Sequence, residues 1–328
     1  MSDVKKTVVV GSGSFGTALA AVFALEGEDE VTLLGRNAVL MEMLAETREH
    51  PKALPGITLP KALDFTMDPS VLEAADTIVL AVPAQAQRAA SLYYAPYLNP
   101  EAVIISASKG IERSTGRLIT DVLNETLPHH HAGALSGPGF AIDLARGKPI
   151  AMALAFRSRA LARDTAEILS GRTFRIYASG DPVGVQIGGA LKNVLAIACG
   201  IVEGAELGES ARAALISRGL AEMSRLAVAM GGEADTVRGL SGLGDLVLTG
   251  SSRQSRNFRY GVALAEGNFD SVNAALVEGV YSASVANELA AEHGVQMPIS
   301  NAVARVLDGK LGIADALDEL MTRPITTE

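Results

Sequence analysis

The residue best suited to chemistry is Lys192, which lies in the otherwise apolar stretch 181–204, DPVGVQIGGALKNVLAIACGIVEG. Asp181 and Pro182 favour a helix start there, because aspartate accepts from free N–H groups and the φ of proline suits the first turn. Lys192 then shares a helix face with small residues, which are Gly188, Gly189, Ala196 and Cys199. Such a lysine could exchange a proton with a bound substrate. The pattern also fits a packing role, in which the small residues admit another helix and the lysine reaches solvent.

A glycine turn near the start of the chain predicts a bound dinucleotide. The sequence GSGSFG, residues 11–16, lies between an apolar strand candidate and an alanine-rich helix candidate. Gly11 permits the tight turn, Gly13 lets the backbone approach a pyrophosphate, and Gly16 lets the helix pack closely on the strand. The N-terminus of that helix then faces the anion. A strand before the glycine turn and a helix after it are the context that dinucleotide binding requires, so the motif indicates a binding site and not only a tight turn.

The residue that follows the second predicted strand bears on the choice of cofactor. Twenty positions after Gly16, where an enzyme that uses NAD usually has an acid, the chain has Arg36. An arginine suits the 2′-phosphate of NADP, whereas an acid suits the ribose hydroxyls of NAD. We therefore expect NADP(H) to be preferred, with NAD(H) as a second cofactor, since some folds of this type accept both.

Two other segments carry cations that could hold an anionic substrate. Lys109 follows an apolar run at a predicted strand end, where it reaches either a ligand or solvent. Residues 239–261 interrupt the helical part of the chain, and we predict an anion-binding loop there. This segment concentrates forked cationic donors and neutral polar groups among glycines and serines. They are Asp245, Arg253, Arg256, Asn257 and Arg259.

Two kinds of structure must position these residues. Between residues 64 and 177, apolar runs alternate with helical segments, which predicts a doubly wound, mostly parallel sheet with its ligand crevice beyond the carboxyl ends of the strands. After residue 180 the strand signals fade and alanine-rich helices take over. We therefore predict an α/β fold with a Rossmann-type dinucleotide-binding domain over 1–180 and an all-helical domain for substrate binding and catalysis over 181–328.

Composition excludes several classes of function. The 328 residues are 48% hydrophobic and carry a net charge of -9, which argues against a general binder of nucleic acid or of membrane surfaces. The stretch 181–204 contains Gln186, Lys192 and Asn193 and is too polar for a membrane span. The histidine run 129–131 predicts a solvated loop, and no spacing indicates a metal site. A single cysteine and an N-terminus without a signal-peptide pattern indicate the cytoplasm.

Taken together, the motifs resemble the bacterial NAD(P)-dependent glycerol-3-phosphate dehydrogenases. The resemblance covers nearly the whole chain, and it is the order and spacing of the motifs that make it specific. They are GSGSFGTALA, LPGITLP, SASKGIE, LSGPGFA, GGALKN, GLGDLVLTGSSRQSRN and LVEGV. The resemblance implies reduction of dihydroxyacetone phosphate to sn-glycerol 3-phosphate, which would supply glycerophospholipid synthesis.

The family's functional residues carry over to matching positions of this chain. By this resemblance Lys192 is the proton donor and acceptor. The substrate would be held by Lys109, Gly137, Gly139, Lys192, Asp245, Ser255, Arg256 and Asn257. The cofactor would be held by the turn glycines Gly11, Gly13 and Gly16, and by Ser14, Phe15, Arg36, Lys109, Ala141, Arg256, Leu276 and Glu278.

Two positions depart from the family pattern. Gly139 stands where the family usually has serine, so only backbone donation to the substrate remains there. Phe15 stands where tryptophan is frequent, which is a milder change in a packing or stacking role.

The expected reaction needs a hydride for the ketone carbon and a proton for its oxygen. We expect Lys192 to give the proton during reduction and to take it back in reverse. We also expect Asp245 either to orient Lys192 or to accept hydrogen bonds from substrate hydroxyls.

Two rival functions remain at this point. One is a two-domain dehydrogenase of hydroxy acids such as 3-hydroxyisobutyrate or 6-phosphogluconate, in which GLGDLVLT and QSRN are not expected. The other is a protein that senses the NADP(H) ratio without catalysis, which would need the glycine turn and Arg36 but not Lys192, Asp245 and Arg256 together. The alanine-rich helices also leave room for a homodimer.

Overall fold

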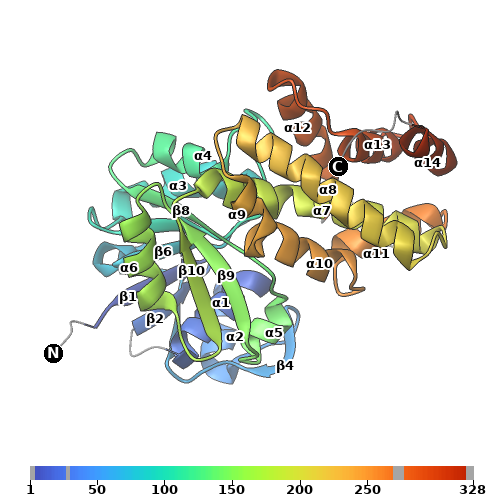
Figure 1. Cartoon of the computed structure of the whole chain (residues 1–328). Coiled ribbons are helices and arrows are strands. Elements are labelled where there is room, and N and C mark those ends of the chain that lie inside the picture. Colours follow the sequence, from blue (N-terminus) through green and yellow to red (C-terminus); the bar gives the residue numbers. More distant parts are fainter. Residues whose placement is uncertain (1–3, 27–29, 269–276, 323–328) are drawn as a thin grey trace. The chain divides into compact units, whose positions relative to one another are not determined.

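The computed structural model describes residues 4–26, 30–268 and 277–322 (Figure 1). The chain forms two compact units, residues 1–112 with 117–186 and residues 113–116 with 187–328. The boundary between the two units along the chain therefore falls within one helix, α7 (Pro182–Gly204). The division predicted at residue 180 lies just before the start of that helix.

The first unit is built on an eight-stranded sheet whose order is β10-β9-β8-β7-β6-β1-β2-β5. Neighbouring strands are parallel except β8 and β9, which confirms the predicted doubly wound, mostly parallel sheet. The strands are β1 (Lys6–Val10), β2 (Glu30–Leu34), β5 (Leu63–Thr66), β6 (Thr77–Leu80), β7 (Val103–Ser106), β8 (His131–Ser136), β9 (Ile150–Ala155) and β10 (Phe174–Ser179). A separate antiparallel pair is formed by β3 (Glu49–His50) and β4 (Leu54–Thr58).

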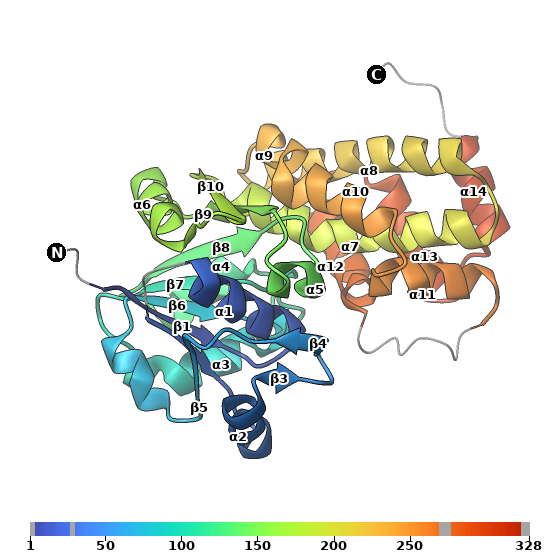
Figure 2. The same cartoon turned by 90° about the horizontal axis from the view of Figure 1, so that it is seen from below.

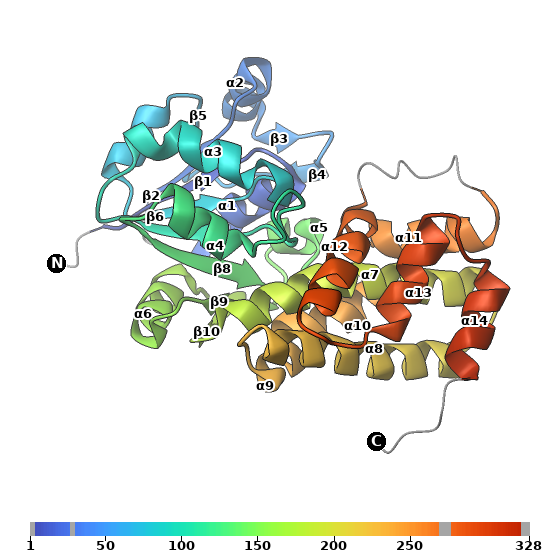
Figure 3. The same cartoon turned by 90° about the horizontal axis from the view of Figure 1, so that it is seen from above.

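Alternation along the strands gives the sheet two buried faces. In β1, Val9 belongs to one buried cluster, whereas Val8 and Val10 belong to another, as the period of two in a strand requires. The Val9 face is covered by α1 (Ser14–Glu26), α2 (Ala38–Thr47), α5 (Ala141–Ala145) and α6 (Arg159–Leu169). The other face is covered by α3 (Gln87–Tyr94) and α4 (Ile119–Thr126), which lie side by side (Figure 3).

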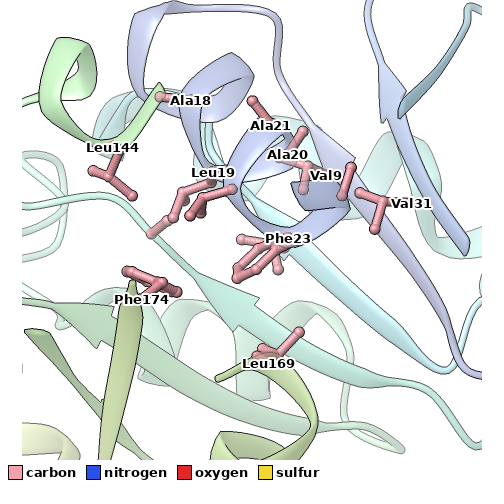
Figure 4. Packing of buried hydrophobic residues seen from close by; sticks show 14 of the residues in the cluster. Val9, Ala18, Leu19, Ala20, Ala21, Phe23, Val31, Leu144, Leu169 and Phe174 are labelled. Carbon is pink, nitrogen blue, oxygen red and sulfur yellow. The ribbon is translucent and has the colours of Figure 1, made fainter. Parts of the chain in front are cut away.

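Helix α1 is held close to the sheet by small side chains and one aromatic pair. Its alanines lie against the strands, and Phe23 meets Phe174 of β10 with ring centroids 5.7 Å apart (Figure 4). An edge-to-face pair of this kind adds about 1 kcal/mol to the free energy gained by burial. The packing fixes the helix that begins at the glycine turn.

The second unit is a set of helices around α7 (Figure 2). After α7 come α8 (Glu209–Ala229), α9 (Ala234–Arg238), the π-helical turn Leu240–Gly244, α10 (Asp245–Gly250), α11 (Arg256–Ala265), α12 (Glu278–Glu292), α13 (Pro298–Leu307) and α14 (Ile313–Met321). Helices α7 and α11 touch backbone to backbone: a Cβ on Gly200 would lie 2.1 Å from the Phe258 carbonyl oxygen, and one on Gly261 would lie 2.0 Å from that of Ile197.

The expectation that residues 181–204 are too polar for a membrane span is wrong in its reasoning, because α7 is long and apolar enough to cross a membrane by length and composition alone. In this structure, however, 94% of its most apolar 18-residue window is buried inside the protein. That environment is typical of the core helix of a globular unit.

The structure differs from the sequence-based expectations in two segments. Residues 239–261 were expected to form a loop, but they form the π-helical turn, α10 and the start of α11, so only Gly239 and residues 251–255 are without helix. The histidine run was expected to be a solvated loop, yet His131 begins β8 and His130 Nε2 lies 3.2 Å from the Asn99 carbonyl oxygen. In both cases neighbouring elements, which the local sequence does not reveal, supply the partners that order the segment.

Candidate active site

Lys192 lies in the middle of α7 and is only 6% exposed. Its Nζ donates to Asp245 Oδ1 at 3.0 Å and to Thr249 Oγ1 at 2.8 Å. The interpretation in which this lysine reaches solvent is therefore wrong. The predicted pairing of Asp245 with Lys192 is present.

The small residues beside Lys192 allow the segment that carries its partners to come close. A Cβ on Gly188 would lie 2.9 Å from Gly242 N and 3.0 Å from Gly242 Cα, in the π-helical turn. Gly242 in turn is held against α9, since a Cβ there would lie 1.9 Å from the Val237 carbonyl oxygen. π-Helical turns of this kind are rare and occur often at functional sites. The turn delivers Asp245, the first residue of α10, directly to Lys192.

The three side chains form a buried polar group with a defined direction of hydrogen bonding. Asp245 is 2% exposed and Thr249, one turn later on α10, is 4% exposed. The Thr249 hydroxyl has one proton, which it donates to the Asp245 backbone carbonyl or to Oδ1 at 3.1 Å, so its oxygen accepts from Lys192. Removing either member of a buried charge pair is costly, so the carboxylate holds the lysine in place. The arrangement can present a proton donor at a fixed position.

Thr249 was not identified from the sequence. The signal that could have found it is its i+4 spacing from Asp245, which places both on one face of a helix. That signal was hidden because the segment was interpreted as a loop.

Asn257 and Ser255, both predicted to bind substrate, make hydrogen bonds within the helical unit. Asn257 Nδ2 donates to Asn193 Oδ1 at 2.8 Å, and Asn257 Oδ1 accepts from Gly279 N at 3.0 Å. The Ser255 hydroxyl caps α11 by accepting from Phe258 N at 3.2 Å. These bonds position the start of α11 next to the Lys192 helix.

The three arginines of this segment differ in what they contact. Arg253 pairs with Glu203 at 3.6 Å, and Arg259 donates to the backbone carbonyls of Arg253 and Gln254. Within the part of the chain that the structure describes, the exposed Arg256 has no ion pair or side-chain hydrogen bond. Arg256 is therefore the arginine of this segment that can turn to a ligand.

Glu278, predicted to contact the cofactor, is exposed at the start of α12 and accepts from Asn193 Nδ2 at 3.3 Å. Leu276, the other predicted cofactor contact of this region, lies outside the described residues. The second unit thus holds Lys192, Asp245, Ser255, Arg256, Asn257 and Glu278.

In the first unit the glycine turn has the predicted strand–turn–helix geometry. Gly11 has a φ of +118°, and a Cβ on Gly16 would lie 2.0 Å from the Gly11 carbonyl oxygen, so packing within the protein requires both glycines. A Cβ on Gly13 would meet no protein atom within 4 Å. Contacts within the described part of the protein therefore do not require glycine at position 13, and the backbone there is open to an approaching ligand.

The glycine turn is held by a histidine that sequence reasoning missed. His50 of β3 is 5% exposed, and its Nδ1 accepts from Ala53 N at 3.3 Å. Its Nε2 therefore carries the proton and donates to the Ser12 carbonyl oxygen at 3.1 Å. No sequence pattern signalled this contact, because it depends on the pairing of two short strands.

A cavity of about 530 Å³ adjoins the turn and is lined by Gly11, Gly13, Arg36 and Tyr94 among others. Arg36 is exposed and directly follows β2. The structure therefore brings Arg36 and the glycine turn to one cavity, as the predicted cofactor site requires.

Lys109, Gly137 and Phe15 also lie together in the first unit. Lys109 Nζ donates to the Gly137 carbonyl oxygen at 2.8 Å and lies 5.7 Å from the centroid of the Phe15 ring. Ser14 begins α1 and Ala141 begins α5. A Cβ on Gly139 would lie 2.6 Å from the Met152 methyl carbon, so the end of Met152 occupies the space where the family usually has a serine side chain.

Among the described residues, no group of three or more His, Cys, Asp or Glu side chains could hold a metal ion.

Two family models match the chain. The N-terminal model of the NAD-dependent glycerol-3-phosphate dehydrogenases matches residues 6–162, and the C-terminal model of the same enzymes matches residues 181–318.

Individual relatives agree with these matches. Glycerol-3-phosphate dehydrogenases that use NAD(P)+ are 58% identical in Agrobacterium fabrum, over 99% of both chains, and 59% identical in Rhizobium johnstonii, over 98% of both chains. The crystal structure of glycerol-3-phosphate dehydrogenase from Coxiella burnetii is similar with a TM-score of 0.90 and 35% identity, and the match covers 98% of this chain and 99% of that one.

Proposed function

The chain belongs to the family of NAD-dependent glycerol-3-phosphate dehydrogenases, and on that premise we propose how its own residues carry out the family reaction. The protein is an NAD(P)-dependent oxidoreductase that interconverts dihydroxyacetone phosphate and sn-glycerol 3-phosphate. We propose that residues 1–180 bind the dinucleotide and that residues 181–328 supply the catalytic and main substrate-binding groups.

The observation that carries the mechanism is the buried Lys192 with its two acceptors, Asp245 and Thr249. When it is bound, the nicotinamide supplies the hydride for the ketone carbon. Lys192 Nζ gives a proton to the ketone oxygen in reduction and takes it back in the reverse direction. Asp245 and Thr249 fix Nζ, so that little reorganisation is needed when negative charge develops on that oxygen.

For the substrate phosphate we propose the start of α11. Arg256 supplies a forked cation, and the helix N-terminus adds a favourable dipole. Ser255 and Asn257 make the structural bonds described above and could also donate or accept toward the ligand. Lys109 and the Gly137 and Gly139 backbone complete the proposed substrate set from the first unit.

For the cofactor we propose a pyrophosphate at Gly11, Gly13, Ser14, Phe15 and Gly16, with Arg36 at the adenosine end. Lys109, Ala141, Arg256 and Glu278 complete the proposed set, and Leu276 belongs to it by resemblance alone. Because Arg36 stands where NAD enzymes usually have an acid, we propose that NADPH is used more efficiently than NADH.

Three further properties are proposed from the family and the composition. The product supplies glycerophospholipid synthesis, the enzyme acts in the cytoplasm, and it forms a homodimer. The alanine-rich helices of the second unit leave room for a dimer. Sedimentation equilibrium would test it, and a mass equal to the 34.0 kDa chain would contradict it.

The substrate assignment is tested by comparing dihydroxyacetone phosphate with dihydroxyacetone, with NADPH as reductant. We expect turnover with the phosphate ester, and a fall in kcat/KM of at least about tenfold in Arg256→Ala with little change for the unphosphorylated ketone. Turnover with a hydroxy acid instead, or nucleotide binding without any turnover, would favour one of the rival functions.

A further inference from the structure

The cavity at Arg36 has a second polar wall. On one side it is lined by Gly35, Arg36 and Asn37, which follow β2. On the other side lies α3, which contributes Ala89, Ala90, Tyr93 and Tyr94. The residues that α3 contributes to the cavity are thus two small alanines and an adjacent pair of tyrosines.

Tyr94 has a buried ring and a hydroxyl that makes no hydrogen bond to the described part of the protein. It is 4% exposed, and its ring belongs to the buried cluster beneath α3 and α4. Within the described residues, its hydroxyl has no hydrogen-bond partner. The hydroxyl is not among the fully buried side-chain atoms that lack a partner, so it opens to the cavity that Tyr94 lines, where a ligand can accept its hydrogen.

Arg36 and Tyr94 line the same cavity from two different segments of the chain. Burial raises the pKa of Tyr94, and the positive charge of Arg36 opposes that rise. Both residues line one cavity, so a single bound group can reach the phenol and the guanidinium. Both are donors at neutral pH, so the group that suits them is an anion with several acceptor oxygens.

The position of Tyr94 is fixed by the elements around it. Gln87, the first residue of α3, donates to the carbonyls of Leu80 and Val82 at 3.2 and 3.1 Å, which ties the helix to the end of β6. The Tyr93 ring packs edge-on against Tyr94 with centroids 4.9 Å apart. A hydroxyl held in this way can discriminate between ligands, because little entropy is lost when it binds.

The opposite wall adds a further preference for anions. Helix α2 begins just after Arg36, and its N-cap Asn37 accepts from Leu40 N at 3.1 Å. Because Asn37 also lines the cavity, the positive end of this ten-residue helix lies at the cavity wall.

We propose that Tyr94 is a specificity-determining residue of the cofactor site, which donates its phenol hydrogen to the 2′-phosphate that distinguishes NADP(H) from NAD(H) while Arg36 binds the same phosphate. The inference rests on the proposed function in one respect, which is that a dinucleotide occupies this cavity. It goes beyond that function because neither the glycine turn nor Arg36 identified a residue of α3.

The test is calorimetric titration of the full-length protein with NADP+ and, separately, NAD+. Tyr94→Phe keeps the ring and removes only the hydroxyl, so the fold should be retained. We expect the Kd for NADP+ to rise about tenfold and the Kd for NAD+ to stay within twofold. Tyr97→Phe is the matched control, since Tyr97 is a half-buried tyrosine of the same region that does not line the cavity, and both its affinities should equal those of the wild type.

A double-mutant cycle with Arg36→Ala sharpens the assignment. If both residues hold one phosphate, the loss of NADP+ affinity in the double variant should be smaller than the product of the two single losses. Equal effects of Tyr94→Phe on both nucleotides, or no effect on either, would overturn the inference, as would fully independent losses. Loss of NADP+ discrimination in a protein that does not reduce dihydroxyacetone phosphate would support the inference and contradict the proposed function.

Discussion

At the scale of single residues, the site depends on the hydrogen bonds that hold one buried ammonium group. Lys192 donates to Asp245 and Thr249, and both acceptors come from a single turn of α10. The carboxylate of Asp245 attracts the ammonium group by its charge. The Thr249 hydroxyl donates its proton to Asp245, so its oxygen accepts from Lys192 and fixes the direction of that hydrogen bond. We therefore assign Thr249 as a positioning residue that acts through Lys192.

This role predicts the effect of Thr249→Val, which keeps the shape of the side chain and removes the hydroxyl. We expect kcat for reduction to fall about tenfold to hundredfold, because Nζ loses one of two fixed partners, while the Kd for NADPH stays within twofold. Thr249→Ser should restore most of the activity. An unchanged kcat in the valine variant, or no rescue by serine, would contradict the assignment.

The sequence identified Lys192 and Asp245 but not Thr249 or His50. Lys192 stands out because a lysine is unusual in an apolar helix. Asp245 stands out because an acid is unusual in a segment that contains three arginines. Thr249 and His50 are ordinary residue types, and their roles come only from contacts, across 57 positions in the case of Lys192 and Thr249 and across 38 in the case of His50 and Ser12. Such contacts depend on how elements pack, which local patterns do not determine.

At the scale of elements, two glycines of the turn are expected to have different roles. Gly16 is required by packing within the protein, whereas Gly13 is expected to be required by the bound ligand. In Gly16→Ala the new Cβ would meet the Gly11 carbonyl oxygen, so we expect the free energy of unfolding to fall by at least about 2 kcal/mol. In Gly13→Ala no protein atom is met, so stability should be unchanged or rise by up to about 1 kcal/mol. The Kd of Gly13→Ala for NADP+ should nevertheless rise tenfold or more.

Urea unfolding and nucleotide titration of the two variants measure both effects. If Gly13→Ala binds NADP+ as tightly as the wild type, the pyrophosphate does not approach the turn at that position.

A second element-scale prediction concerns the start of α13. Glu222 of α8 is 1% exposed and accepts from Ile299 N at 2.6 Å and Ser300 N at 3.1 Å. Burial raises the pKa of Glu222 above its ordinary 4.5, although these hydrogen bonds oppose the rise. A raised acid pKa means that the folded state binds more protons than the unfolded state, so this contribution to stability is complete below about pH 4 and is lost as the pH rises through the folded pKa.

Glu222→Gln removes that titration. We expect the unfolding free energy of the variant, relative to the wild type, to increase when the pH is raised from about 4 to 8. A relative decrease would mean that the hydrogen bonds outweigh burial and that the pKa is lowered instead.

The elements themselves were predicted unevenly from the sequence. The strand–turn–helix around Gly11 and the long apolar helix containing Lys192 were predictable, because each has a continuous pattern and a clear start signal. The short strands β3, β4 and β5 and the helix α10 were not, since each is six residues or fewer and is stabilised mainly by its neighbours.

At the scale of the whole molecule, the sequence predicted an α/β domain followed by an all-helical domain. The first was predicted from the alternation of strands and helices, and the second from the helical segments that follow. The helical domain illustrates why composition can mislead: α7 has the apolar character of a membrane span, but the surrounding helices bury it. The glycines on α7 then have a structural reason, because they admit the backbones of α11 and the π-helical turn. One of those close approaches also brings Asp245 to Lys192, so the packing of the core also forms the buried pair of Lys192 and Asp245.

The central claim is that Lys192 supplies the proton when dihydroxyacetone phosphate is reduced. The most direct measurement is NADPH oxidation by the purified protein with this substrate, for the wild type, Lys192→Ala and Lys192→Gln, alongside the Kd of each for NADPH. Glutamine is included because it can still donate to Asp245 and so protects the fold from an unpaired buried carboxylate. We predict turnover by the wild type and a loss of about 10²- to 10⁴-fold in kcat in both variants, with NADPH affinity retained. Turnover in the variants comparable to that of the wild type would contradict the claim.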